Sequence, residues 1–223
     1  MKQFCGTTHK TNKHKKMKRT GWKCKFEEIP PDCYEDVLVW DCSGNGLTSL
    51  PSEIGCLANL QVLDCWGNQL TSLPPEIGRL TNLQVLYCGW NGLTSLPPEI
   101  GRLTNLMVLD CGNNQLTSLP PQIGRLTNLH ELHCPGNELT SLPPEIGRLT
   151  NLQELICSEN QLSSKTMEAV EKILVRNKEG DPRDVLVLIL LHDFLGNTFP
   201  FQLCDQILLH CRVQWFCDDM DSS

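Results

Sequence analysis

Cysteine is the residue type in this sequence that most invites a chemical interpretation. Six of the 13 cysteines recur at intervals of 23 residues. A row of thiols could bind a metal ion or react as nucleophiles, because the thiolate serves in both roles. In a stacked row, however, each thiol has only two neighbours, and buried cysteine packs as a small hydrophobe. We therefore assign the row to the core: Cys42, Cys65, Cys88, Cys111, Cys134 and Cys157.

Two other groups combine cysteine with histidine. The N-terminal group contains no CxxC or HxxxH pair, and the lysines between its members would repel a cation. In the C-terminal group, Cys204 and Cys211 fall on one stripe of a predicted helix, as core residues do. We predict no metal site, no cofactor and no catalytic residue. The two groups are Cys5, His9, His14 and Cys24, and Cys204, His210, Cys211 and Cys217.

A 23-residue unit repeats through the central part of the chain. Residues 60–82 read LQVLDCWGNQLTSLPPEIGRLTN, and residues 83–105 read LQVLYCGWNGLTSLPPEIGRLTN. Alternating apolar and polar residues at the start of each unit predict a short strand, which cannot continue through Pro-Pro. A single unit exposes its leucines, so the units must stack to close one core. Five full units and a truncated sixth occupy residues 37–162.

The pattern L-x-x-L-x-C-x-x-N-x-L resembles the leucine-rich repeat, with cysteine in the last strand leucine position. The remainder, LTSLPPEIGRLTN, is similar to the 23-residue subclass of intracellular adaptor proteins and microbial effectors. The resemblance implies an α/β solenoid with a curved parallel sheet on the concave face and an irregular or 3-10 convex side. We expect a disordered basic tail over residues 1–25, an N-terminal cap over 26–36 and a helical C-terminal cap over 163–223.

An asparagine follows each cysteine of the row by three residues, where the strand bends away. Its side-chain amide carries both donors and an acceptor, so it can satisfy backbone groups of successive coils. We predict that this column is structural: Asn45, Asn68, Asn91, Asn114, Asn137 and Asn160.

The strand positions that point away from the core vary, whereas the rest of each unit is nearly copied. Invariant positions build the coil, and variable positions are free to specify a partner. Aromatic residues surrounded by charge are typical of protein interfaces. We therefore predict a partner-binding surface made of Asp64, Trp66, Tyr87, Trp90, Asp110, Glu131, His133 and Glu154.

The function we expect is that of a monomeric protein-interaction module or adaptor. Its partner would carry basic and apolar groups, because residues 37–162 hold 11 acids against four arginines. The alternative is an effector with a cysteine-dependent or F-box-like, ubiquitin-related activity in the C-terminal segment. Residues 199–208 are similar to the start of an F-box helix, but about 60 residues after the repeats are too few for a ligase domain.

The charge distribution and the hydropathy bear on localisation. Residues 1–25 hold nine of the 19 basic residues and no acid, in a chain of net charge −7. The stretch Lys13–Arg19 resembles a nuclear import signal, with phosphate binding, an anionic membrane surface or a solvated tail as alternatives. Without interleaved aromatics, nucleic acid is not the favoured partner. The longest apolar run, Val185–Leu191, is too short to span a membrane, and an odd cysteine count favours a reducing compartment. We expect an intracellular, cytoplasmic protein, with the nucleus as the alternative.

Overall fold

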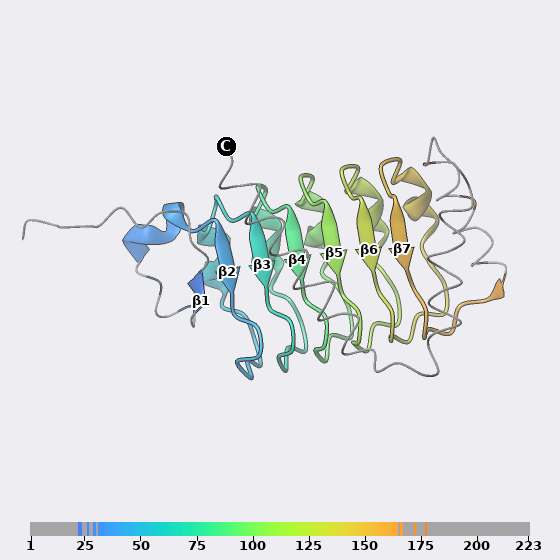
Figure 1. Cartoon of the computed structure of the whole chain (residues 1–223), viewed down its shortest axis with the longest axis horizontal. Coiled ribbons are helices and arrows are strands. Elements are labelled where there is room, and N and C mark those ends of the chain that lie inside the picture. Colours follow the sequence, from blue (N-terminus) through green and yellow to red (C-terminus); the bar gives the residue numbers. More distant parts are fainter. Residues whose placement is uncertain are drawn as a thin grey trace, which may run out of the picture.

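Each 23-residue unit forms one coil that consists of a short strand, a loop and a 3-10 helix (Figure 1). The computed structural model describes residues 22–23, 26, 29, 31–164, 166, 172 and 177. The strands of the repeats are β2 Val39–Asp41, β3 Val62–Asp64, β4 Val85–Tyr87, β5 Val108–Asp110, β6 Glu131–His133 and β7 Glu154–Ile156. The 3-10 helices are η2 Pro31–Asp36, η3 Ser52–Cys56, η4 Pro75–Arg79, η5 Pro98–Arg102, η6 Pro121–Arg125 and η7 Pro144–Arg148.

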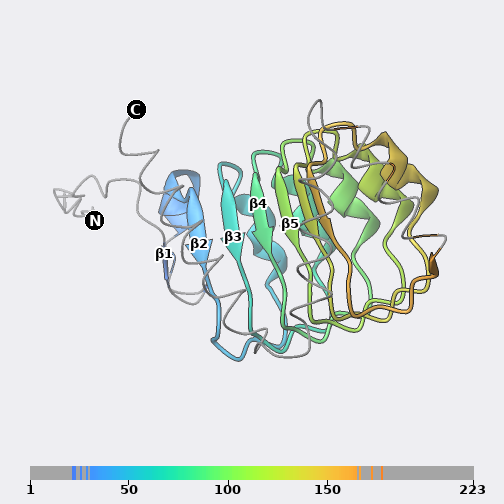
Figure 2. The same cartoon turned by 45° about the vertical axis from the view of Figure 1, so that its right-hand side comes forward.

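The strands form one parallel sheet in the order of the sequence, and the 3-10 helices lie behind it (Figures 1 and 2). Between successive repeats the register is 23 residues throughout, so that Leu63 pairs with Leu86 and Leu86 with Leu109. The predicted architecture, a parallel sheet with a 3-10 side opposite, is confirmed. We call the side of the sheet that faces away from the helices the sheet face.

The first coil is extended by residues that do not belong to the repeat. A two-residue strand, β1 Trp22–Lys23, pairs with β2, although these residues lie in the stretch expected to be a disordered tail. The open backbone edge of β2 accounts for the pairing, because an unpaired strand edge is a template for another strand. Phe26 is buried with its ring centroid 5.3 Å from that of Trp40, and Ile29 is buried in the same core.

The core runs continuously between the sheet and the 3-10 helices. Every central strand residue from Trp40 to Leu155 is buried, as is the isoleucine of every 3-10 helix from Ile54 to Ile146. The cysteine row lies in the same core, with exposed fractions between 0% and 4%. The prediction that this row is packing material is thereby confirmed.

From Asn68 to Asn160, the asparagine column joins neighbouring coils as predicted, whereas Asn45 in the first coil is exposed. The Asn68 Nδ2 donates to the carbonyl oxygens of Cys42 at 3.0 Å and Cys65 at 2.9 Å. Its Oδ1 accepts the backbone N–H groups of Asn45 and Leu47 at 3.1 and 3.0 Å. Nδ2 also donates to the two corresponding carbonyls at Asn91, Asn114, Asn137 and Asn160. Each amide therefore satisfies backbone groups that the bend would leave unpaired.

A second asparagine column, which the sequence analysis did not single out, lies at the end of each unit. Each of its side chains donates to a carbonyl 24 residues earlier at 2.8–2.9 Å. These bonds tie the exposed loops of successive coils together. The column comprises Asn59, Asn82, Asn105, Asn128 and Asn151.

Beyond the last coil, the structure describes only a few residues of the expected C-terminal cap. Ser163 accepts the Thr166 N–H on its Oγ at 3.2 Å, which is the helix-capping bond that Ser at this position favours. The helical Asn177 donates to the carbonyls of Leu149 and Leu152, so it contacts the end of the repeat array. Within the described part of the chain, no helix is long and apolar enough to cross a membrane.

Several predictions concern residues that the structure does not describe. They are the basic stretch Lys13–Arg19, both cysteine–histidine groups outside the repeats, the apolar run Val185–Leu191 and the F-box-like residues 199–208.

Candidate functional site

Six of the eight residues that the sequence predicted for partner binding flank the buried central residues of strands β3 to β7, and the two tryptophans lie in the loops that follow β3 and β4. In most strands the central residue is buried and its two neighbours are partly exposed. β4 differs, because Val85 and Tyr87 are only 2% and 8% exposed. Tyr87 therefore offers a partner less surface than the sequence pattern indicated.

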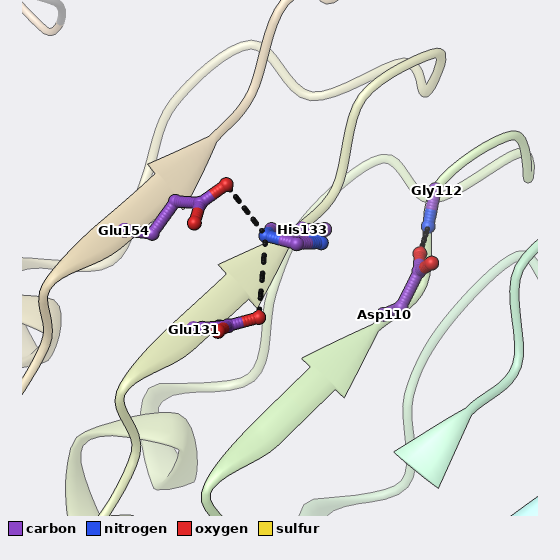
Figure 3. A network of polar contacts seen from close by, with 5 residues as sticks. All are labelled: Asp110, Gly112, Glu131, His133 and Glu154. Atoms are coloured by element: carbon purple, nitrogen blue, oxygen red, sulfur yellow. Dashed lines mark hydrogen bonds and ion pairs between the residues drawn. The ribbon is translucent and has the colours of Figure 1, made fainter. Parts of the chain in front are cut away.

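The aspartates of the sheet face have a structural contact in addition to their charge. The Asp64 Oδ1 accepts the N–H of Trp66 at 3.0 Å, and Asp110 accepts that of Gly112 at 2.9 Å (Figure 3). A carboxylate that accepts the backbone N–H of the residue two positions later stabilises a turn. These aspartates hold the loop that leaves the strand, a role that the sequence analysis did not assign to them.

The two tryptophans lie against each other, with ring centroids 6.0 Å apart and planes inclined at 52°. The two tryptophans occupy adjacent positions of the 23-residue unit, since one unit reads Trp66-Gly67 and the next reads Gly89-Trp90. Trp90 consequently occupies the second loop position, where its φ is +51°. The equivalent residues in the other coils also have positive φ: Gly44, Gly67, Asn113, Gly136 and Glu159.

Trp90 has two features that are unfavourable for folding. Positive φ costs a residue with a side chain roughly 1–2 kcal/mol, whereas glycine adopts it freely. In addition, the indole Nε1 is buried and has no hydrogen-bond partner within the described part of the chain. Glycine at this position would avoid both costs.

A second cluster lies on β6 and β7, the last two strands of the sheet (Figures 1 and 3). The His133 Nε2 is 3.2 Å from Glu154 Oε1 and 3.9 Å from Glu131 Oε2. Burial alone would lower the pKa of His133, but the carboxylates of Glu154, Asp110 and Glu131 together raise it above its ordinary value. The cluster therefore concentrates negative charge around one imidazole.

Glu131, His133 and Glu154 also have the donor types of a metal site. One donor atom from each residue lies within 4.8 Å of the other two. Among the residues that the structure describes, no other group of three histidine, cysteine or acidic side chains converges in this way. From the sequence alone, all three residues are predicted to belong to the partner-binding surface, and no metal site is predicted. The available signal was Glu-x-His in one unit and Glu in the corresponding place of the next.

The cysteine row does not offer reactive chemistry. Burial raises the pKa of Cys65, Cys88 and Cys134, which suppresses the thiolate that would act as nucleophile or ligand. The sheet face and its two clusters thus remain as the candidate site.

Comparison with known proteins agrees with this architecture. A family described as leucine-rich repeat region matches residues 90–175, and a single leucine-rich repeat matches residues 59–80. A leucine-rich-repeat protein of Leptospira interrogans is 36% identical with a TM-score of 0.60, over 68% of this chain and 39% of that one. No curated protein matches the chain.

A plant structure is similar over a somewhat shorter stretch. It is the leucine-rich-repeat ectodomain of the membrane receptor kinase GASSHO1/SCHENGEN3 from Arabidopsis thaliana, solved in complex with Casparian strip integrity factor 2. Its identity is 32% and its TM-score 0.55, over 60% of this chain and 17% of that one. The chain therefore spans less than half the length of either protein.

Proposed function

Because this chain is a leucine-rich-repeat protein, we propose that it binds a protein partner on its sheet face and acts as a monomeric intracellular adaptor without chemistry of its own. Leucine-rich repeats generally mediate protein–protein interaction, and the plant ectodomain was solved in complex with Casparian strip integrity factor 2. The invariant positions of the repeat are used for core and backbone contacts. The variable ones remain on the sheet face.

The observation that carries the proposal is the pair Trp66 and Trp90. Glycine at position 90 would satisfy the backbone, as Gly67 and Gly136 do in equivalent places. Tryptophan there adds backbone strain and a buried indole N–H. It also presents, with Trp66, a half-buried aromatic surface beside the Asp64 carboxylate. Large aromatic side chains of this kind dominate the binding energy of protein interfaces.

The charges of the sheet face indicate the chemistry of the partner. Asp64, Asp110, Glu131 and Glu154 all lie on it, whereas the four arginines of the repeats are exposed in the 3-10 helices on the other side. Complementary charge favours association and excludes partners of the same sign. The partner surface would therefore combine basic groups with an apolar centre that covers the tryptophans.

We expect the double change Trp66→Ala and Trp90→Gly to abolish partner capture without damaging the fold. Each aromatic side chain should contribute about 1–2 kcal/mol to binding, so removal of both weakens the complex by roughly 30-fold or more. Glycine fits the positive φ at position 90, so thermal unfolding should stay within about 4 °C of the parent chain. The measurement is quantitative capture from matched cell extract, with the parent and variant chains as baits.

The matched control is Arg102→Ala with Arg125→Ala, which changes two exposed side chains of the 3-10 helices. Proteins retained by the parent and by this control but absent with the tryptophan variant support the proposal. Equal capture by all three baits contradicts it.

A further inference from the structure

We propose that Glu131, His133 and Glu154 form a binding site for a divalent transition-metal ion, and that Zn²⁺ suits its donor set best. The site is independent of the proposed function, because it belongs to the isolated chain and requires no protein partner.

The strand register places the three side chains together. Glu131 and His133 are alternate residues of β6, so both point to the sheet face while Leu132 between them is buried. Glu154 is paired with Glu131 across β6 and β7. Figure 3 shows the imidazole between the two carboxylates. The three donors therefore come from two adjacent, paired strands of the sheet.

The distances are close to those that a bound ion requires. Tetrahedral Zn²⁺ with ligand bonds of about 2.0–2.1 Å holds its donor atoms roughly 3.3–3.5 Å apart. The separation of 3.2 Å between His133 Nε2 and Glu154 Oε1 already meets this condition. The 3.9 Å from His133 Nε2 to Glu131 Oε2 exceeds it by a few tenths of an ångström. The Glu131 side chain is 24% exposed and can close that gap by rotation.

The imidazole of His133 is oriented by groups on both of its sides. The His133 Nε2 is buried and lies 3.2 Å from Glu154 Oε1, so both carboxylates and the imidazole nitrogen are directed at one point. The neighbour of His133 on β5 is Asp110, on the side of the second ring nitrogen (Figure 3). A carboxylate there is the usual support of a metal-binding histidine.

The donor chemistry selects the type of ion. Carboxylates directly opposite each other, as Glu131 and Glu154 are, repel, and a dication between them relieves the repulsion. The imidazole nitrogen favours zinc and its neighbours in the transition series over Ca²⁺ or Mg²⁺, which prefer oxygen. Three protein donors leave the fourth tetrahedral position open toward the sheet face, where water or a partner side chain can bind.

The test is calorimetric titration of the full chain with Zn²⁺ alone, after native alkylation has blocked the accessible thiols. We expect His133→Gln to lose one equivalent of zinc, and Glu131→Gln or Glu154→Gln to weaken that equivalent at least roughly tenfold. The matched control is His130→Gln in the same repeat, whose Nδ1 lies 2.7 Å from the Asn128 carbonyl outside the cluster. This variant should bind zinc as the parent chain does.

A second measurement uses the effect of the ion on unfolding. Zinc should raise the thermal midpoint of the parent chain by mass action, but not that of His133→Gln. The Glu→Gln changes keep the side-chain shape and remove repulsion, so these variants should fold. Equal zinc stoichiometry and affinity in His133→Gln and the parent chain would overturn the proposal. Normal zinc binding without partner capture would instead refute only the proposed function.

Discussion

Cysteine follows each strand of the repeats at a position where the core leaves little room. The Cys65 thiol donates to the Tyr87 carbonyl at 3.3 Å and the Cys88 thiol to the Asp110 carbonyl at 3.2 Å, each in the next coil. These contacts and the burial of the sulfur atoms make the row a structural ladder. The thiols of this row are unreactive because the fold buries them, although cysteine itself is a reactive residue type.

Alkylation of the native chain should distinguish the row from an exposed thiol. We expect iodoacetamide at neutral pH to modify Cys56, which is exposed, and to spare Cys88, Cys111 and Cys134. Burial raises the pKa of the latter three, and their reaction waits for an opening of the fold. That opening costs several kcal/mol, so labelling should be on the order of 10³-fold slower at these sites.

Peptide mass spectrometry can follow each thiol separately. Cleavage after Arg79, Arg102, Arg125 and Arg148 gives single-cysteine peptides for Cys88, Cys111 and Cys134. The tryptic peptide that ends at Arg79 contains Cys56 together with three other cysteines, so fragment ions are needed to locate the label there. Unfolding in guanidinium provides the control, since all sites should then react alike. Native labelling of the row at the rate of Cys56 would show that the coils are open in solution.

The 3-10 helices are the elements that set the spacing of the coils on the side away from the sheet. A glycine lies in each of the repeat helices, where the next helix approaches closely. A Cβ atom added at Gly101 would lie 2.7 Å from the Gln122 carbonyl oxygen, and one at Gly124 only 2.5 Å from that of Glu145. Because both contacts are with backbone, the helices would have to move apart to relieve them. At the end of the array, a Cβ on Gly147 meets nothing within 4 Å.

The substitution Gly101→Ala should destabilise the protein, whereas Gly147→Ala should not. Overpacking between stacked elements costs about 1–3 kcal/mol. Urea unfolding of the two variants measures the difference directly, because both replace glycine by alanine at the same position of the unit. Equal midpoints for Gly101→Ala and Gly147→Ala would show that the helix spacing adjusts freely.

At the scale of the whole molecule, one register governs every contact between coils. The strands pair with a 23-residue offset, and both asparagine columns bond to the neighbouring coil at fixed offsets. Each coil is stabilised by the two coils beside it, as in other repeat arrays. The number of coils can therefore change without altering the structure of the individual coil.

Deletion of residues 106–128, one complete unit, should leave a folded and shorter solenoid. The cut joins Asn105 to Leu129, so the asparagine and leucine columns stay in phase. We expect a cooperative urea transition whose m value falls roughly in proportion to the length removed. The shorter deletion of residues 106–116 is the control, because it breaks the phase and should prevent folding. Circular dichroism that showed both deletions equally folded would contradict a single register.

Much of the architecture was predictable because the repeat fixes which residues are equivalent. Once Leu63, Cys65 and Asn68 recur every 23 residues, only stacked coils can bury the first two and use the amide of the third. The pairing of β1 with β2 was not predictable in this way. Trp22 lies outside the repeat in a basic stretch, and only the open edge of the first coil explains its position.

The sequence by itself determined the coil, its core and the columns that point to the sheet face, because these depend on spacing within and between units. Only the tertiary structure decided how side chains meet across those columns. It brought Trp66 against Trp90, gave Asp64 and Asp110 a turn contact and buried Tyr87. It also directed the His133 imidazole between two carboxylates. Partner binding by this face stays a prediction. The side-chain contacts depend on loop conformation and side-chain rotamers, which residue spacing does not specify.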